Sequence, residues 1–201
     1  MSRGAIIALS ILGAIILIAL GIVGWGFGVY NNLVSYDQNV KQSWAEVENQ
    51  YQRRYDLIPN LVATVKGYAK HEADVFEKVA EARSSVGKLT ITPQVLDNPQ
   101  AFRRFQQAQD GLSNALSRLL AVSENYPDLK ANQNFLALQS QLEGTENRIA
   151  VERMRFNQAV QSYNTLVQRM PSAIIASLSG FHVRAYFEAV QGASVAPKVQ
   201  F

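Results

Sequence analysis

Residues 4–23 read GAIIALSILGAIILIALGIV, and Ser10 is the only side chain in this run that is not apolar. A helix of about 20 apolar residues matches a bilayer hydrocarbon core about 30 Å thick. Trp25, Phe27 and Tyr30 follow the run, at the place where aromatic side chains favour the interface between membrane and water. We therefore predict a membrane anchor over residues 1–30, with these three aromatic residues at its interface.

A cleaved secretory signal is the competing interpretation of this segment. Such a signal needs a shorter apolar core, of about 7–15 residues, and a cleavage site with small residues. The run is longer here, and Gly24-Trp25-Gly26 makes a poor cleavage site, which favours an uncleaved anchor. Arg3 and the amino terminus precede the span, while Lys41 is the first basic residue after it. This charge distribution favours a cytoplasmic N-terminus, with the rest of the chain outside.

Apolar residues after the anchor recur every three or four positions, as in helices, and nowhere alternate as in strands. The first run contains Leu33, Val40, Trp44, Val47, Tyr51, Tyr55, Ile58, Val62 and Val65. Pro59 lies within this run and is predicted to interrupt it with a kink near residues 55–58. A shorter helix follows, with Val75, Val79, Ala82 and Val86 on one face.

The second half of the chain carries start and stop signals for further helices. Residues 87–98 are predicted to be irregular, and Asn98 to cap a third helix that begins at Pro99. Asp128 is predicted to cap a fourth helix over residues 129–170, whose apolar stripe is close to a heptad repeat. Pro171 is expected to end that helix, and Gly180 to close a short segment after it. Phe181, Tyr186 and Phe187 are then expected to cover the end of the bundle, or else to contact a partner or the membrane.

These signals together predict an all-α fold. We expect an N-terminal transmembrane helix, an elongated, coiled-coil-like, antiparallel four-helix bundle over residues 31–190 with a short C-terminal helical segment, and a flexible tail over residues 191–201.

The composition offers little catalytic chemistry. Among 201 residues there is no cysteine, which excludes disulfides and thiol nucleophiles. The two histidines, His71 and His182, are far apart, and His71-Glu72 lacks the second histidine that a zinc-protease helix needs. Basic and acidic residues alternate and give a net charge of only +3, which argues against nucleic-acid binding. We predict no enzyme, cofactor or metal; a carboxylate pair of Asp56 and Glu146 is the remote catalytic alternative.

Two polar stripes are the candidate sites. Asn49, Arg53, Asp56 and Asn60 lie three or four positions apart in the first helical run, away from its apolar seam. A second stripe in the fourth predicted helix contains Glu146, Arg153, Asn157 and Asn164. Three interpretations of the stripes are open: contacts between helices of one chain that fix register, a contact face for a second copy, or a ligand site.

Two longer motifs resemble a known family. One is RRYDLIPNLV at residues 53–62, continuing through VKGY at 65–68 and His71-Glu72; the other is ENYPDLKAN at 124–132, continuing through Phe135, Leu138 and TENRIA at 145–150. With the single N-terminal span, these motifs resemble the LemA family of bacterial membrane proteins over about residues 1–190. The resemblance implies a helical bundle on one membrane anchor and relatives in magnetosome-membrane biogenesis. It supplies no catalytic residues, and it implies an N-terminus outside the cell, opposite to the charge distribution.

We therefore predict a non-enzymatic scaffold in the bacterial cytoplasmic membrane that self-associates and organises or shapes the cell envelope. Its expected partners are the lipid bilayer, further copies of the same chain and other membrane proteins. The alternative is a sensor or adaptor of the envelope that binds a ligand or a membrane-protein partner.

Overall fold

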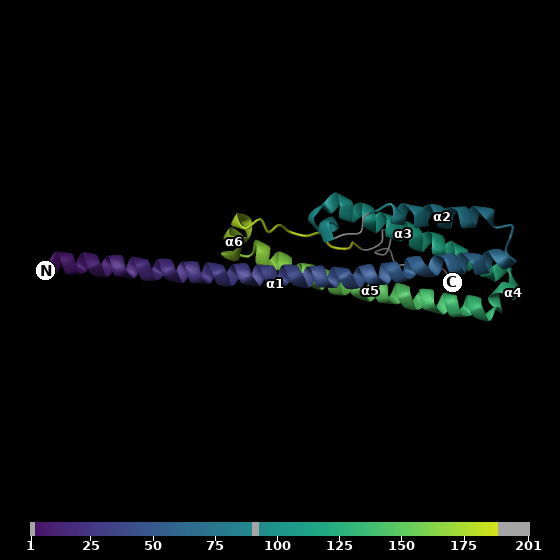
Figure 1. The fold of residues 1–201 in the computed structure, drawn as a ribbon, viewed down its shortest axis with the longest axis horizontal. Coiled ribbons are helices and arrows are strands. Elements are labelled where there is room, and N and C mark those ends of the chain that lie inside the picture. Colours follow the sequence, from purple (N-terminus) through teal and green to yellow (C-terminus); the bar gives the residue numbers. More distant parts are fainter. Residues whose placement is uncertain (1–2, 90–92, 189–201) are drawn as a thin grey trace, which may run out of the picture. The chain divides into compact units, whose positions relative to one another are not determined.

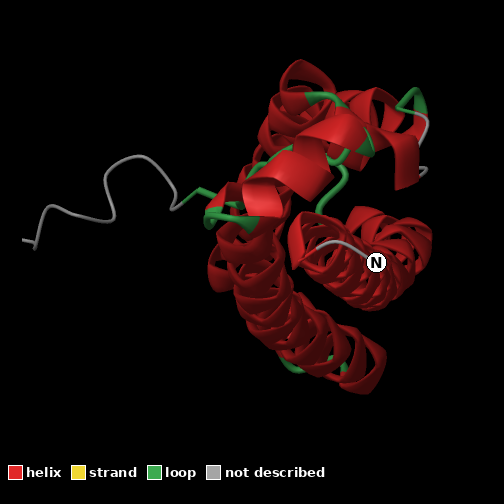
Figure 2. Ribbon diagram, turned by 90° about the vertical axis from the view of Figure 1, so that its left-hand side faces the viewer, coloured by secondary structure: helices red, strands yellow, loops and turns green. Residues whose placement is uncertain are grey.

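Helices form almost all of the described chain. The computed structural model describes residues 3–89 and 93–188, apart from the side chains of residues 5, 6, 8, 93 and 94. The elements are α1 (Arg3–Tyr68), α2 (Ala73–Gly87), the 3₁₀ helix η1 (Pro93–Asp97), α3 (Pro99–Val122), the 3₁₀ helix η2 (Ser123–Asn125), α4 (Pro127–Lys130), α5 (Gln133–Gln168) and α6 (Ser172–Leu178) (Figure 1). Within these ranges Figure 2 shows helices and loops but no strand. The all-α prediction is confirmed.

The chain divides into two compact units, and α1 contributes residues to both. We call residues 1–40 and 159–183 the anchor unit, and residues 41–158 and 184–201 the core unit. The predicted boundary at residue 30 falls inside α1, so the anchor continues without a break into the helix that follows. The predicted tail over residues 191–201 lies outside the described residues.

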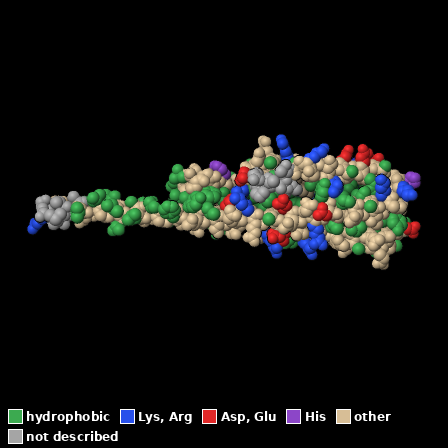
Figure 3. Space-filling model, viewed as in Figure 1, with side chains coloured by type: hydrophobic (Ala, Val, Ile, Leu, Met, Phe, Trp, Pro, Cys, Tyr) green, Lys and Arg blue, Asp and Glu red, His purple; other side chains and the backbone are tan. Residues whose placement is uncertain are grey.

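The N-terminal part of α1 is apolar and exposed. It is the one helix in the described part of the chain that is long and apolar enough to cross a bilayer. Its large apolar side chains between Ile7 and Val23 are exposed, and Figure 3 shows hydrophobic atoms along this part of the anchor unit. Water penalises so much exposed apolar surface, whereas lipid does not. The segment therefore fits a membrane anchor.

The core unit has an apolar core to which several helices contribute. The core side chains come from α1, α2, α3, α4, α5 and the residue after α1: Ile58, Leu61, Val65, Ala69, Val79, Val86, Leu112, Ala115, Leu116, Leu119, Val122, Leu129, Phe135 and Leu142. The three-and-four spacing of the apolar residues places one face of each long helix in this core. A shared core does not by itself establish an antiparallel, coiled-coil-like four-helix bundle, so that arrangement stays a prediction.

An aromatic cluster in the same unit surrounds Trp44 of α1. The Trp44 ring lies 5.2 Å from that of Phe105, 5.6 Å from Phe156, 5.9 Å from Phe102 and 6.2 Å from Phe187, measured between centroids. Edge-to-face and offset rings at such distances attract one another beyond their buried area. The cluster therefore joins α1, α3, α5 and the extended residues 184–188.

The helix does not end at Pro59. Residues 3–68 form one helix with Pro59 inside it, so Pro59 does not divide the helix in two, and the kink near residues 55–58 stays a prediction. Pro59 is exposed, while Ile58 and Leu61 beside it are buried in the core. Packing of the neighbouring residues thus offsets the backbone hydrogen bond that proline removes.

The start of the fourth predicted helix also differs from the prediction. Residues 127–130 form the separate short helix α4, and Asp128 lies in its first turn and not before the long helix. The long helix α5 begins at Gln133, and the Asn132 side chain accepts a hydrogen bond of 3.0 Å from the backbone N–H of Phe135. Asn132, and not Asp128, therefore caps α5. By contrast, Asn98 caps α3 ahead of Pro99 as predicted.

Replacing Asn132 by alanine should lower the free energy of unfolding by about 1 kcal/mol, because a lost N-cap typically costs that much. The substitution also removes the 2.8 Å hydrogen bond from Asn132 to the Tyr68 hydroxyl. Denaturant unfolding of the detergent-solubilised protein measures the change. The matched control is Asp128→Ala, at an exposed position, which should change stability by less than about 0.5 kcal/mol. Equal losses in the two variants would contradict this assignment of the cap.

The C-terminal aromatic residues have separate environments. α5 ends before Pro171, and Gly180 closes α6 with a positive φ of 76°, as predicted. Phe181 contacts Tyr30 in the anchor unit, whereas Phe187 is buried in the aromatic cluster of the core unit and Tyr186 is exposed. The tail is therefore not one patch over the end of a bundle, because Phe187 belongs to the core.

Candidate functional site

Arg54 of α1 is the centre of a buried polar network in the core unit. Only 1% of it is exposed. Its guanidinium donates to the Glu146 carboxylate at 2.8 Å and to the Ser113 hydroxyl at 2.6 Å, and to both the side-chain and the backbone carbonyl of Gln109. The acceptors belong to α3 and α5, so one cation connects three helices. Because a buried charge is costly without partners, the network fixes the register of these helices.

A second arginine network lies nearby. The Arg153 guanidinium of α5 donates to the Tyr51 hydroxyl at 2.6 Å and to the Asp110 carboxylate at 3.1 Å. Burial raises the pKa of Tyr51 above its usual value, although Arg153 opposes that shift. Burial lowers the pKa of Arg153, but its contacts with Tyr51 and Asp110 outweigh this effect and leave the pKa raised. The contact is thus between a neutral phenol and a cation, which suits a structural role more than proton transfer.

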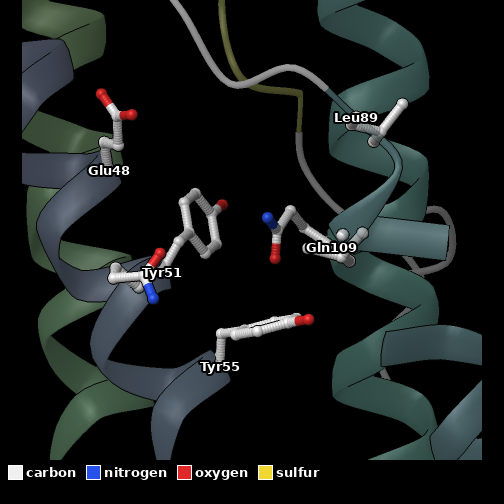
Figure 4. A pocket seen from close by; sticks show the side chains of 8 residues that line it. Glu48, Tyr51, Tyr55, Leu89 and Gln109 are labelled. Carbon is white, nitrogen blue, oxygen red and sulfur yellow. The ribbon is translucent and has the colours of Figure 1, made fainter. Parts of the chain in front are cut away.

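A pocket of about 320 Å³ opens beside these networks (Figure 4). The residues that line it are Glu48, Tyr51, Gln52, Tyr55, Val86, Gly87, Leu89 and Gln109. Among the described residues, the Gln109 side-chain N–H₂ finds no hydrogen-bond acceptor, and the amide points toward Tyr51 in Figure 4. Burial raises the pKa of the Glu48 carboxyl. The pocket can hold a small polar group, but its lining contains no nucleophile activated by a base.

The predicted stripe on α1 is exposed. Asn49, Arg53, Asp56 and Asn60 all face solvent in the core unit, and Asp56 accepts a hydrogen bond of 2.8 Å from Gln52 on the same helix. The helical rotation of about 100° per residue separates Arg53 from Arg54, so that the first points outward and the second inward. The stripe therefore presents one cation and one anion to solvent in the described part of the core unit.

Most residues of the predicted stripe on α5 form contacts with other segments of the same chain. Glu146 pairs with Arg54, and Arg153 pairs with Asp110. The Asn157 amide forms two hydrogen bonds, of 2.9 and 3.0 Å, with the backbone of Phe187, and Asn164 is buried. The α1 half of the predicted face is therefore accessible, whereas the α5 half fixes contacts between helices.

Sequence reasoning missed several of these polar residues. Arg54 lies three residues after Tyr51 and four before Ile58, both in the apolar seam, so the spacing of the seam itself was the signal for a buried arginine. Gln106 of α3 forms a pair of hydrogen bonds with the backbone of Glu188. No periodic signal marks it, because its partner belongs to an extended segment far along the sequence.

The predicted interface residues of the anchor lie on α1 in the anchor unit. Trp25, Phe27 and Tyr30 are exposed, and the Tyr30 ring meets Phe181 edge-on, with centroids 5.9 Å apart. Aromatic side chains favour this position at a membrane surface, and those of Trp25 and Tyr30 also carry a polar group.

The fold and these sites define the class of protein. Within residues 3–89 and 93–188, no group of three His, Cys, Asp or Glu residues is placed to hold a metal ion. Helices pack around structural arginines, and a single apolar helix fits a membrane anchor. The class is an all-α protein with an N-terminal apolar helix that fits a membrane anchor.

The chain belongs to the LemA family, whose model matches residues 43–201. It is similar to magnetosome protein MamQ 2 of Paramagnetospirillum magneticum strain AMB-1, with 25% identity over 94% of this chain and 74% of the relative. Magnetosome protein MamQ of Magnetospirillum gryphiswaldense is 26% identical over 79% of this chain and 64% of the relative. The predicted family is confirmed, and with the apolar helix it supports association with a membrane.

Proposed function

We propose that this protein is a non-enzymatic scaffold that self-associates and organises or shapes the bacterial cell envelope. The observation that carries the proposal is the exposed stripe Asn49, Arg53, Asp56 and Asn60 on α1. In a symmetric dimer, residue i of one copy meets residue j of the other and the reverse. Arg53 and Asp56 are of opposite charge and lie on one face, so the stripe is complementary to itself.

Membrane anchoring supports this proposal physically. Attachment to one surface raises the effective concentration of the copies, so that a small polar face suffices for association. The similarity to magnetosome proteins and the apolar helix are consistent with a protein associated with a membrane.

The variant Arg53→Glu should shift the detergent-solubilised protein from an oligomer toward a monomer, because it places like charges opposite one another. Light scattering coupled to size-exclusion chromatography measures the mass. Arg148→Glu, at an exposed position of α5, makes the same change of charge outside the stripe and should leave the oligomer intact. The double variant Arg53→Glu/Asp56→Arg restores complementarity and should restore the oligomer. A monomeric wild-type protein, or equal behaviour of Arg53→Glu and Arg148→Glu, would refute the self-contact.

We further propose that the anchor lies in the cytoplasmic membrane with the core unit on its extracytoplasmic side, as the Arg3 and Lys41 distribution favours. Because the chain has no cysteine, the variant Met154→Cys, at an exposed position of α5, reports the orientation. Labelling by a membrane-impermeant maleimide in intact cells is the expected result. Protection until the cells are lysed would place the core unit in the cytoplasm.

A sensor or adaptor that binds a ligand is the second candidate, and the pocket beside Gln109 favours it. The unpartnered N–H₂ group of Gln109 and the Glu48 carboxyl both line this pocket. Together they suit a small polar molecule that has both a hydrogen-bond acceptor and a donor. If this function holds, one member of a panel of small amides and carboxylates should raise the melting temperature of the wild type but not of Glu48→Ala. A panel without effect on the wild type would remove the reason for this candidate.

A further inference from the structure

A second apolar surface lies in the anchor unit, on α6 and the residues around it. Leu178 is 81% exposed, Met170 67%, and Ile174 and Val183 each 51%. Ile174 and Leu178 are four positions apart, so they lie on the same face of α6. Each of these side chains is large and apolar, and water penalises their exposure together.

The position of α6 beside α1 indicates what covers this surface. A Cβ atom on Gly26 would lie 3.7 Å from Ile175 Cδ1, and Phe181 meets Tyr30 edge-on. All four residues belong to the anchor unit, and Ser172 and Ala176 of α6 are buried. The short helix is thus fixed against α1 at residues 26–30, where the apolar run of the anchor gives way to its aromatic residues.

The distribution of charge supports the same location. Residues 4–36 contain no Asp, Glu, Lys or Arg, and residues 170–183 contain none either. Charged side chains are costly at membrane depth, and both segments lack them. An exposed apolar face without charges, held beside the end of a membrane anchor, matches a helix lying in the bilayer interface. A partner protein would explain the apolar face, but not its position beside Gly26 and Tyr30.

We propose that α6, with Met170 and Val183 on either side, is a second membrane contact that inserts its apolar face into the interface of the leaflet where the anchor ends. The inference rests on the membrane anchor of the proposed function and is independent of self-association. Two contacts instead of one prevent the anchor unit from tilting freely on its helix. An interfacial helix of this kind also responds to lipid packing and curvature, a property suited to a protein that shapes membranes.

The absence of cysteine allows a direct test with the full chain. An environment-sensitive fluorophore is attached to one introduced cysteine at a time, and each labelled protein is placed in vesicles of phosphatidylcholine and phosphatidylglycerol. The four single variants are Leu178→Cys, Ile174→Cys, Leu17→Cys and Met154→Cys. One quencher is a lipid with a nitroxide on its upper acyl chain, and the other is iodide in the water. All four positions are exposed, so labelling does not disturb a packed core. Leu17 lies within the span and reports the anchor, while Met154 of the core unit is the control for a water-exposed position.

The labels at 174 and 178 should lose most of their emission to the nitroxide lipid and little to iodide, while the label at 154 should show the reverse. Strong iodide quenching at 178, equal to that at 154, would overturn the proposal. Protection at 178 from both quenchers would also overturn it, because protein would then cover the face. A label at 17 that the lipid quencher does not reach would refute the anchor itself, so the two failures are distinguishable.

Discussion

Replacement of Arg54 by leucine should lower the free energy of unfolding by about 3 kcal/mol. Removing one partner of a buried ion pair typically costs about 3–5 kcal/mol, since the other partners lose their compensation. Here the Glu146 side chain is partly exposed and regains some hydration, which places the loss at the lower end. Gln109 and Ser113 lose their donor as well. Denaturant unfolding followed by circular dichroism measures the change.

The neighbouring arginine provides the control. Arg53→Leu, at an exposed position, should change stability by less than about 0.5 kcal/mol. Arg54→Lys keeps the charge but loses the planar fork that reaches acceptors on α3 and α5 together, so its loss should be intermediate. Equal effects of Arg53→Leu and Arg54→Leu would contradict the structural role of the network.

The variant Trp44→Ala should lower the free energy of unfolding by about 3–5 kcal/mol, as is typical of large aromatic residues removed from a core. Trp44 is fully buried and lies among four phenylalanine rings. One of them, Phe187, belongs to the extended segment after α6, so the cavity should also loosen residues 184–188. Hydrogen exchange at the amide of Phe187, which is bonded to Asn157, should accelerate.

Trp44→Phe should cost less than Trp44→Ala. It retains a ring, and it loses no hydrogen bond because the indole N–H finds no acceptor among the described residues. Trp25→Ala, at the other tryptophan, should leave the stability of the core unit unchanged, since Trp25 is exposed on the anchor. A stable Trp44→Ala protein with unchanged exchange at Phe187 would show that the cluster does not hold this segment.

The elements that the sequence predicted correctly depend on local chemistry. The cap at Asn98, the helix that begins at Pro99 and the end of α6 before Gly180 follow from the conformational preferences of single residues. The long apolar helix that fits a membrane anchor follows from the length of its apolar run. Asp128 was misjudged as the cap of the long helix because the chain makes the short helix α4 before α5 begins. At Pro59, packing of the neighbouring residues overrides local preference, and α1 continues past the proline.

The candidate site was less predictable. Periodicity separates a polar face from an apolar one, but it does not reveal which polar faces meet another helix. For that reason it grouped the exposed Arg53 and Asp56 with Glu146 and Arg153, which are engaged within the chain. Arg54 was overlooked because its partners come from α3 and α5, 55 to 92 positions away. Such contacts are visible only in three dimensions.

Cross-linking between copies in native membranes tests the central claim, that α1 presents a contact face for a second copy. Single cysteines at Asn49 and Asp56, in the stripe, are compared with one at Met154 on α5 in a chain that has no cysteine of its own. Under mild oxidation, covalent dimers should form through positions 49 and 56 and not through position 154. Dimers that form equally at all three positions, or only at position 154, would contradict the account.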